Sequence, residues 1–494
     1  MPTRLVFAPS LLVSRWLPVL ALLVLGATLR FWRLGALELI GDESYFWLWS
    51  RHLDWAYFDH PAGVALMVRL STVLGGESEA GIRWLNAALG LACVVLTYAL
   101  GAQMLSRHAG LFAAFLVALG APYLLTSRFV YTDALQLALL LLNLCCFWRL
   151  VQEKPAIRLR TALAFGISLA LLLNTKYNAY LYAAALLVSV LIDHRWLLAQ
   201  KRAWLAALIG ALGLVPVVAW NAAHDWASFR WQFSHAGVPV IRRTGALGKA
   251  YHALLYLTWP LIAVALVGLG RMRLPAQRLL VLVAIALLVP VALSAADSPR
   301  NLSSGLVPLF LLAGELVTSA WARGRRRWAS VGLGLLAAAA AVYGLGSVFN
   351  TFGPTTWPES SGVPAIRQDA AGWRELGPEV AALPAAVFAL DYSIASQVTF
   401  YSGAPAYTAW GQYWIWGIPA LPDWTVVGLE TLPMDLVDQK LRAAFGELKG
   451  PWLLNAEEWG ETKVVRVWEA RNLRLAPQMF LQELDFLTLL RSDY

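Results

Sequence analysis

The sequence predicts a multi-pass α-helical membrane protein with a small α/β domain at its C-terminal end. Hydrophobic residues make up 59% of the chain, charged residues only 14%, and the mean hydropathy is +0.59. A water-soluble domain carries about 25% charged residues. Apolar runs of about 20 residues, the length that crosses a bilayer as a helix, recur along the chain. From about residue 350 onward, charged and polar residues return to the density of a soluble domain.

The first expected span covers residues 16–35. It follows Arg4 and Arg15, so it shares the basic start of a signal peptide. The apolar stretch is longer than a signal-peptide core, and no small-residue cleavage pattern follows it. We therefore expect a retained transmembrane helix.

About eleven spans are expected in all, with an uncertainty of a few residues at each end. They are 16–35, 85–103, 109–125, 133–150, 161–174, 177–193, 203–220, 251–269, 279–295, 302–320 and 328–348. The short loops between the spans form two alternating sets, one on each side of the membrane. Lys and Arg concentrate in one set, and the basic residues of the other set are only Arg128, Lys176 and Arg300. Cytoplasmic loops carry the basic excess, which predicts a cytoplasmic N-terminus and an outer C-terminus.

Two long segments then fall on the outer side: the loop 36–84 and the tail from about 350. We expect a membrane domain at 1–349 that includes this loop, and an extracytoplasmic α/β domain at 350–494. In the tail, AAVFALD, PAYTAW, TVVGLE and PWLLNAE read as strands. GWRELGPEVAALP, SIASQVTFYSG and MDLVDQKLRAAFGEL read as helices. The formal charge of +9 is explained by membrane orientation, and no nucleic-acid motif accompanies it.

The first outer loop concentrates charge and aromatic rings in GDESYFWLWSRHLDWAYFDHP, residues 41–61. Asp42 and Glu43 are adjacent where the first span ends. A carboxylate at the membrane edge can accept a proton from an acceptor hydroxyl as a general base. The alternative is helix capping, with Asp42 or Ser44 as the N-cap.

The aromatic residues of this loop fit a helix that lies in the membrane interface. One helical face carries Tyr45, Leu48, Trp49 and His52, which would hold the rings at headgroup depth. The alternative is that some rings stack on a sugar or a polyprenyl chain. Asp59 and His60 precede Pro61, which suits the first position of a second helix.

Further stretches in the same order complete a family pattern. They are TSRFVYTDALQ (126–136), NTKYNAY (174–180), WNAAHDWASFRWQ (220–232), and GWREL with the later SQVTFYSGAPAY in the tail. Together with the Asp-Glu pair after the first span, the chain resembles the GT-C glycosyltransferases. The branch it resembles is bacterial, related to the protein O-mannosyltransferases and to the aminoarabinose and galacturonic acid transferases of lipid A.

The resemblance implies a hexosyl or pentosyl transfer from an undecaprenyl-type phosphate donor to a lipid or glycan acceptor. It also implies a bacterial inner membrane, lipid A or lipopolysaccharide as first acceptor, and a protein hydroxyl as second. Asp42, with Glu43, falls at the family's catalytic aspartate, and Asp133 at a second acidic position. Asp59 and His60 match an acidic–Lys–Pro element of the aminoarabinose enzymes, in which His here replaces Lys.

A leaving polyprenyl phosphate needs fixed positive charge. Lys176 is the foremost candidate, because its short loop places it nearly within the apolar layer, where an unused charge is costly. A structural ion pair is the alternative. The other candidate donor-phosphate ligands are Arg128, Arg242, Arg243 and Arg300, and the candidate substrate-binding residues are Asp59, His60, Tyr131 and Tyr177.

The metal signal is weak. Asp59 and His224, with Asp225 beside it, are candidate ligands of a divalent cation, but no spacing forms a metal signature. No cofactor is therefore required. For Asp133, which follows Thr132 at a helix start, N-capping is the alternative role.

Two other classes of protein compete with the enzyme. A transporter or flippase of lipid-linked sugars also places charges at membrane depth, but such proteins usually show internal repeats, and none is visible here. A membrane protein whose tail recruits a partner is the third class. Release of polyprenyl phosphate distinguishes the glycosyltransferase from the transporter or flippase, which would release none.

Overall fold

The computed structural model describes residues 9–236, 274–293, 299–324, 363–429, 434–458 and 461–475, and single residues between 327 and 351. The chain divides into two compact units. The helical unit comprises Met1–Trp32, His60–Met67 and Arg83–Val348, and the sheet unit comprises Arg33–Asp59, Val68–Ile82 and Phe349–Tyr494.

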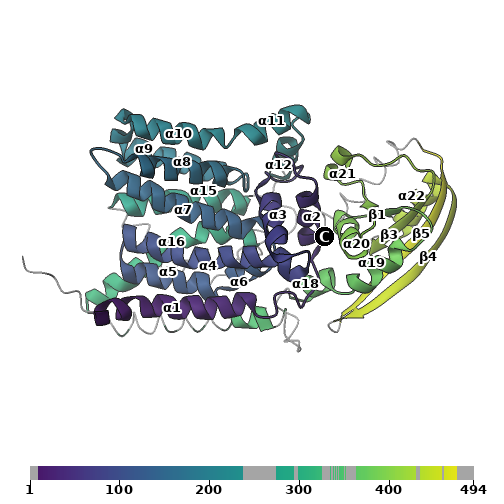
Figure 1. Cartoon of the computed structure of the whole chain (residues 1–494), viewed down its shortest axis with the longest axis horizontal. Helices are drawn as coiled ribbons and strands as arrows, with labels where there is room; N and C mark the ends of the chain where they lie inside the picture. The colour runs from purple at the N-terminus through teal and green to yellow at the C-terminus, as the bar shows by residue number, and fades with distance from the viewer. Residues whose placement is uncertain are drawn as a thin grey trace, which may run out of the picture. The chain divides into compact units, whose positions relative to one another are not determined.

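The helical unit is a bundle of apolar helices that run side by side (Figure 1). Within the described residues, four helices are long and apolar enough to cross a membrane, or five if a bent pair counts as one span. The four are α4 (Glu79–Met104), α7 (Thr132–Gln152), the run Lys201–Ala223 and the run Arg300–Ala322. The last two runs contain α10 (Lys201–Leu212), α11 (Val215–Ala223) and α16 (Ser303–Ala322).

Further apolar helices belong to the described part of the bundle. They are α1 (Pro9–Phe31), α8 (Leu159–Leu173), α9 (Ala179–Asp193) and α15 (Pro275–Leu293). A Cβ at Gly101 on α4 would lie 2.3 Å from the Cα of Gly110, which belongs to the helix Arg107–Leu119. The backbones of these two helices are therefore in direct contact. Small residues at helix contacts are the usual solution in membranes, where no hydrophobic effect drives helices together.

The bent pair is α5 (Arg107–Leu119) and α6 (Ala121–Arg128), which meet at an angle of 55°. Pro122 has no N–H to give to the carbonyl of Ala118, so the helical ladder breaks there. The fully buried Arg30 donates to the carbonyls of Val117 and Ala118, both at 2.9 Å. In lipid every carbonyl must find a donor within the protein, and Arg30 supplies it at this break.

The sheet unit contains a five-stranded sheet in the order β2-β1-β3-β5-β4. Its strands are β1 (Val387–Ala389), β2 (Ala406–Tyr407), β3 (Trp424–Leu429), β4 (Phe445–Glu458) and β5 (Glu461–Leu473). The first three strands are parallel, and β5 is antiparallel to both β3 and β4. The buried rings of Phe388, Trp424 and Trp468 contribute to its core.

Helices of the tail pack on this sheet (Figure 1). They are α19 (Trp373–Ala381), α20 (Tyr392–Ser402) and α22 (Met434–Ala444), with α18 (Val363–Ala370) and α21 (Gly411–Trp416) beside them. The same unit holds α2 (Gly41–Arg51), which packs against α20. This contact brings the first loop and the tail, more than 300 residues apart, into one compact body.

The start of α2 differs from the expected capping. Its N-cap is Ile40, whose N–H donates to the Glu43 carboxylate at 3.1 Å. The helix therefore begins before Asp42, and neither Asp42 nor Ser44 is the cap. The second helix, α3 (Gly63–Gly75), starts two residues after Pro61 rather than at it.

The coarse fold class is confirmed, since the chain is mostly helical and carries several apolar helices. The number of about eleven spans, the extracytoplasmic C-terminal domain and the boundary at residue 349 stay predictions. The expected span 251–269 lies outside the described residues, and only scattered residues of the span 328–348 lie inside them.

Candidate functional site

Asp42 lies on the first turn of α2 and is half-buried. Its Oδ1 accepts a hydrogen bond from the Tyr392 hydroxyl of α20 at 2.9 Å. The N-terminal turn of a helix favours a negative charge, because unpaired N–H groups point out of it. The position thus suits an anionic carboxylate that must be held in one orientation.

Glu43, the neighbouring candidate, is fully buried. Its carboxylate folds back onto the N–H of Ile40, as a residue at the third position of a helix does in a capping box. The structure thus places Glu43 as a residue that fixes the start of α2, beside Asp42.

Asp59 is half-buried, with the Trp410 indole N–H at 3.4 Å from its Oδ2. Burial raises the pKa of Asp59 to about 7, the charge of Asp42 adds to this, and Tyr45 and Trp410 oppose it. Asp59 therefore titrates near neutral pH.

Two carboxylates of the tail lie at the starts of α2 and α20. Asp369 accepts the Gly41 N–H at 3.0 Å, and burial raises its pKa to about 6. Asp391 is the N-cap of α20 and accepts the Ser393 N–H at 2.8 Å. Neither residue was predicted, because an acidic helix cap carries no sequence signal that distinguishes it from any other.

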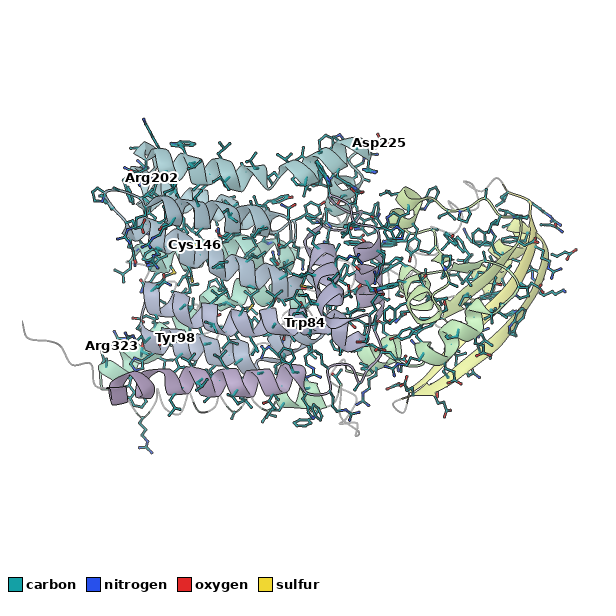
Figure 2. All side chains as sticks on the ribbon, viewed as in Figure 1. Trp84, Tyr98, Cys146, Arg202, Asp225 and Arg323 are labelled. Atoms are coloured by element: carbon teal, nitrogen blue, oxygen red, sulfur yellow. The ribbon has the colours of Figure 1, made fainter. Side chains whose placement is uncertain are left out.

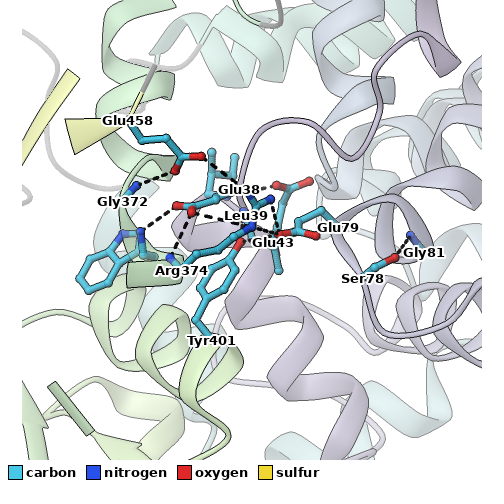
Figure 3. A network of polar contacts seen from close by, with 12 residues as sticks. Glu38, Leu39, Glu43, Ser78, Glu79, Gly81, Gly372, Arg374, Tyr401 and Glu458 are labelled. Carbon is cyan, nitrogen blue, oxygen red and sulfur yellow. Dashed lines mark hydrogen bonds and ion pairs between the residues drawn. The ribbon is translucent and has the colours of Figure 1, made fainter. Parts of the chain in front are cut away.

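A second polar network holds the residues just before α2 (Figure 3). The fully buried Glu38 accepts the first two N–H groups of α19, from Trp373 at 2.7 Å and Arg374 at 3.0 Å. The Arg374 guanidinium also pairs with Glu79 at 2.8 Å and Glu458 at 3.5 Å. Burial raises the pKa of Glu38, and the nearby Glu458 adds to the shift.

The helical unit holds a separate cluster around Lys176. Its Nζ donates to Asp133 Oδ1 at 3.1 Å and to Asn301 Oδ1 at 2.7 Å. The side chain of Lys176 is 14% exposed and that of Asp133 only 4%, so this ion pair is largely shielded from solvent. Arg300 lies over the Tyr131 ring, 3.9 Å from its centroid. The structure thus brings four predicted residues together at one set of helix ends.

The remaining predicted residues are placed as follows. Arg128 is fully buried, with its guanidinium bonded to the carbonyls of Leu29 and, at 2.7 Å, Trp32 at the end of α1. The Tyr177 hydroxyl bonds the hydroxyl of Ser228. His60 is half-buried. Arg242 and Arg243 lie outside the described residues.

The metal candidates belong to different units, Asp59 to the sheet unit and His224 and Asp225 to the helical unit. His224 stacks on Trp220, with ring centroids 4.2 Å apart, and its Nδ1 lies 2.8 Å from the Trp220 carbonyl. The part of the chain that the structure describes contains no group of three or more His, Cys, Asp or Glu side chains placed to hold a metal ion. We assign no step of the chemistry to a metal.

Comparison with known proteins shows where this architecture occurs. The family model described as dolichyl-phosphate-mannose-protein mannosyltransferase matches residues 59–220. Crystal structures of ArnT from Cupriavidus metallidurans, in the apo state and bound to undecaprenyl phosphate, align at TM-scores of 0.60 and 0.59 with 17% identity. Both alignments cover 93% of this chain and 98% of ArnT. The chain has a GT-C fold.

Other comparisons agree with the GT-C fold, which confirms the predicted resemblance. The archaeal oligosaccharyltransferase AglB from Archaeoglobus fulgidus aligns at a TM-score of 0.55 with 11% identity, over 81% of this chain and 65% of AglB. The lipid A galacturonosyltransferase RgtD from Rhizobium johnstonii is 28% identical over 222 residues. That match covers 42% of this chain and 44% of RgtD, so the chain matches less than half of this relative.

One prediction for this GT-C chain concerns the titration of Asp59. In the folded protein its pKa is about 7, above its ordinary value near 4 in the unfolded chain. The folded state thus holds this proton more tightly, and the resulting stability is lost as the pH rises from about 4 to about 7. We expect Asp59→Asn to unfold at a higher temperature than wild type at pH 8. Their difference in unfolding free energy should widen by about 2 kcal/mol between pH 5 and pH 8, allowing for partial exposure.

Thermal unfolding in detergent, for both proteins across this pH range, measures the effect. Asp369 also stabilises the folded state at low pH, but it does so in both proteins and cancels in the comparison. Equal pH dependence of the two proteins would show that Asp59 does not titrate near neutral pH.

A second prediction separates the two roles of Lys176. Removing Lys176 alone leaves Asp133 buried without its partner, which costs about 3–5 kcal/mol. The variant Lys176→Ala should therefore be studied together with Asp133→Asn, which removes the stranded charge. We expect the double variant to fold but to show a higher KM for a polyprenyl-phosphate sugar than Asp133→Asn alone, whereas Lys176→Arg retains part of wild-type donor use. Equal KM values in the double and the single variant would remove Lys176 from the donor site.

Proposed function

We propose that this GT-C protein is an integral membrane glycosyltransferase that moves a hexosyl or pentosyl group from a polyprenyl phosphate to an acceptor outside the cytoplasmic membrane. The observation that carries the proposal is the Asp42 carboxylate, held on the first turn of α2 by the Tyr392 hydroxyl. The GT-C fold supports it, as does the presence of undecaprenyl phosphate in one ArnT structure.

The proposed chemistry uses two kinds of group. Asp42 accepts the proton of an acceptor hydroxyl while the oxygen of that hydroxyl forms the new bond to the sugar carbon. The bond from that carbon to the phosphate oxygen breaks, and polyprenyl phosphate leaves with the bonding electrons. Lys176 and Arg300 supply fixed positive charge for the phosphate, which is worth most where water is excluded.

The proposed acceptor is lipid A or another part of lipopolysaccharide. The support is the similarity to RgtD, whose name states transfer to lipid A. A protein hydroxyl is the second candidate, because the matching family model is that of protein mannosyltransferases. Mass spectrometry of lipid A, core oligosaccharide and secreted glycoproteins, with and without the gene, tests both. A sugar missing from glycoproteins alone would favour the second acceptor, and three unchanged profiles would contradict the proposal.

We further propose that the protein resides in a bacterial inner membrane with its N-terminus in the cytoplasm. Figure 2 shows that Arg323 and Asp225 lie at opposite ends of the helical unit, and both are exposed. With an impermeant thiol reagent on intact spheroplasts, we expect Asp225→Cys to react and Arg323→Cys not to react. Wild type, whose cysteines are Cys93, Cys145 and Cys146, is the background control. The opposite labelling would invert the orientation and place loop 36–84 inside.

A further inference from the structure

Hydrogen bonds from the tail of the chain hold the segment that carries Asp42. The side-chain amide of Gln397 donates to the carbonyl of Leu39 at 2.9 Å, and the hydroxyls of Ser44 and Ser396 lie 2.8 Å apart. With the Asp369 bond to Gly41, these contacts fix the backbone on both sides of Asp42. All of the partners come from residues 369–397, far along the chain.

Tyr392 of the tail donates a hydrogen bond to the Asp42 side chain itself. Its ring is fixed between two others, with centroid distances of 4.7 Å to Tyr45 and 5.0 Å to Trp410. Burial raises the pKa of the Tyr392 hydroxyl well above its ordinary value. The hydroxyl therefore stays protonated at working pH and acts as a donor.

The backbone of α20 places this hydroxyl rigidly. Asp391 caps the helix directly before Tyr392, and Gly403 ends it with a φ of 74°, which glycine adopts without strain. The contact with α2 is close, because a Cβ at Gly41 would lie 2.2 Å from the Cβ of Ser393. Helix α20 thus cannot shift without moving the turn that holds Asp42.

We infer that Tyr392 is a positioning residue for the Asp42 base, so that α20 of the tail sets the orientation in which Asp42 meets the acceptor. This inference rests on the proposed function. A carboxylate that is free to rotate spends part of its time misaligned, and small misplacements of a reacting group cost rate.

Other acidic side chains lie close to this hydrogen bond, so the rates of the variants must be compared at one pH. Asp59, Asp369 and Asp391 lie near Asp42 or Tyr392, and the first two titrate at about 7 and about 6. At pH 8 both Asp59 and Asp369 are ionised, so their charge is the same in all the variants compared.

The test is a double-mutant cycle in purified protein, with sugar transfer from a polyprenyl-phosphate sugar as the readout. Tyr392→Phe keeps the ring contacts and removes only the hydroxyl. We expect kcat to fall about 10-fold at pH 8, the effect of one lost hydrogen bond to a charged group. The KM for the donor should be unchanged.

The decisive comparison is Tyr392→Phe in an Asp42→Asn background. If the tyrosine acts through Asp42, the double variant should be no slower than Asp42→Asn alone. A general structural defect would instead slow both backgrounds by the same factor. Tyr407→Phe is the matched control, since this half-buried tyrosine on β2 makes no described contact with Asp42, and it should keep the wild-type rate.

The outcomes separate this inference from the proposed function. A slow Asp42→Asn with a fully active Tyr392→Phe, or with a Tyr392→Phe effect equal in both backgrounds, overturns the positioning role and leaves the proposed function intact. An Asp42→Asn variant that keeps the wild-type rate removes Asp42 as the base and overturns the positioning role with it, whereas wild-type protein that transfers no sugar overturns the proposed function.

Discussion

Asp42→Asn should leave a folded, membrane-inserted protein whose rate of sugar transfer is about 10²–10⁴-fold below that of wild type, the usual contribution of a general base. The amide has nearly the same size as the carboxylate and can still accept the Tyr392 hydrogen bond, so the start of α2 should keep its structure. What is lost is the ability to take a proton. The measurement is turnover of purified protein in detergent, with thermal unfolding as the control for folding.

The chemistry of the acceptor changes the size of this loss. A phosphate monoester is already anionic near neutral pH, with a second pKa of about 6, and needs no strong base. With a sugar or protein hydroxyl as acceptor, Asp42→Asn should lose the full contribution of the general base, about 10²–10⁴-fold in rate. With a phosphate acceptor the loss should be smaller, and the rate should follow ionisation of the phosphate. An Asp42→Asn variant with more than about half of wild-type turnover on either acceptor would remove Asp42 from the catalytic machinery.

Gly41→Ala should abolish most activity although it adds a single methyl group. A Cβ at this position would lie 2.2 Å from the Cβ of Ser393, a separation that two carbon atoms do not tolerate. Helices α2 and α20 would have to move apart, which breaks the bond between Asp42 and Tyr392. We expect a stability loss of about 1–3 kcal/mol, as for other overpacked sites, and a fall in turnover of at least about 10-fold.

A suppressor makes this prediction specific. Ser393→Gly removes the opposing Cβ and leaves the Ser393 Cα as the nearest atom, at 3.2 Å. Combined with Gly41→Ala it should restore part of the activity, at the cost of about 1 kcal/mol for a glycine within a helix. Gly334→Ala is the control, because no atom of the described residues outside its own helix turns lies within 4 Å of its Cβ position. Full activity of Gly41→Ala alone would show that the close approach of the two helices is not needed.

The tail illustrates what sequence patterns predict well. The stretches AAVFALD and SIASQVTFYSG correspond to β1 and to α20, which ends at Gly403 as predicted. The predicted strand PWLLNAE lies within the longer β4. Strand β5 was missed, because Lys463, Arg466 and Glu469 interrupt its apolar pattern, and its pairing with both β3 and β4 is a long-range property.

The candidate site shows the corresponding limit. Asp42 and Lys176 were identified because unusual residues stand at expected membrane edges, and Asp133 was identified from the family resemblance. The Lys176–Asp133 contact joins two of these three residues. Tyr392 and Asp369 gave no signal, since a tyrosine at a helix start and an acid in a polar tail are ordinary. Only the packing of α20 on α2 gives them their place. The roles of all these residues in catalysis stay predictions.

The central claim is that the chain transfers a sugar from polyprenyl phosphate with Asp42 as the base. Purified wild type and Asp42→Asn, incubated in detergent with a labelled polyprenyl-phosphate sugar and a lipid A acceptor, test it most directly. The account predicts that wild type releases polyprenyl phosphate in step with labelling of the acceptor, and that Asp42→Asn releases almost none. Wild-type protein that binds the labelled donor but releases no polyprenyl phosphate, as a flippase would, contradicts the account.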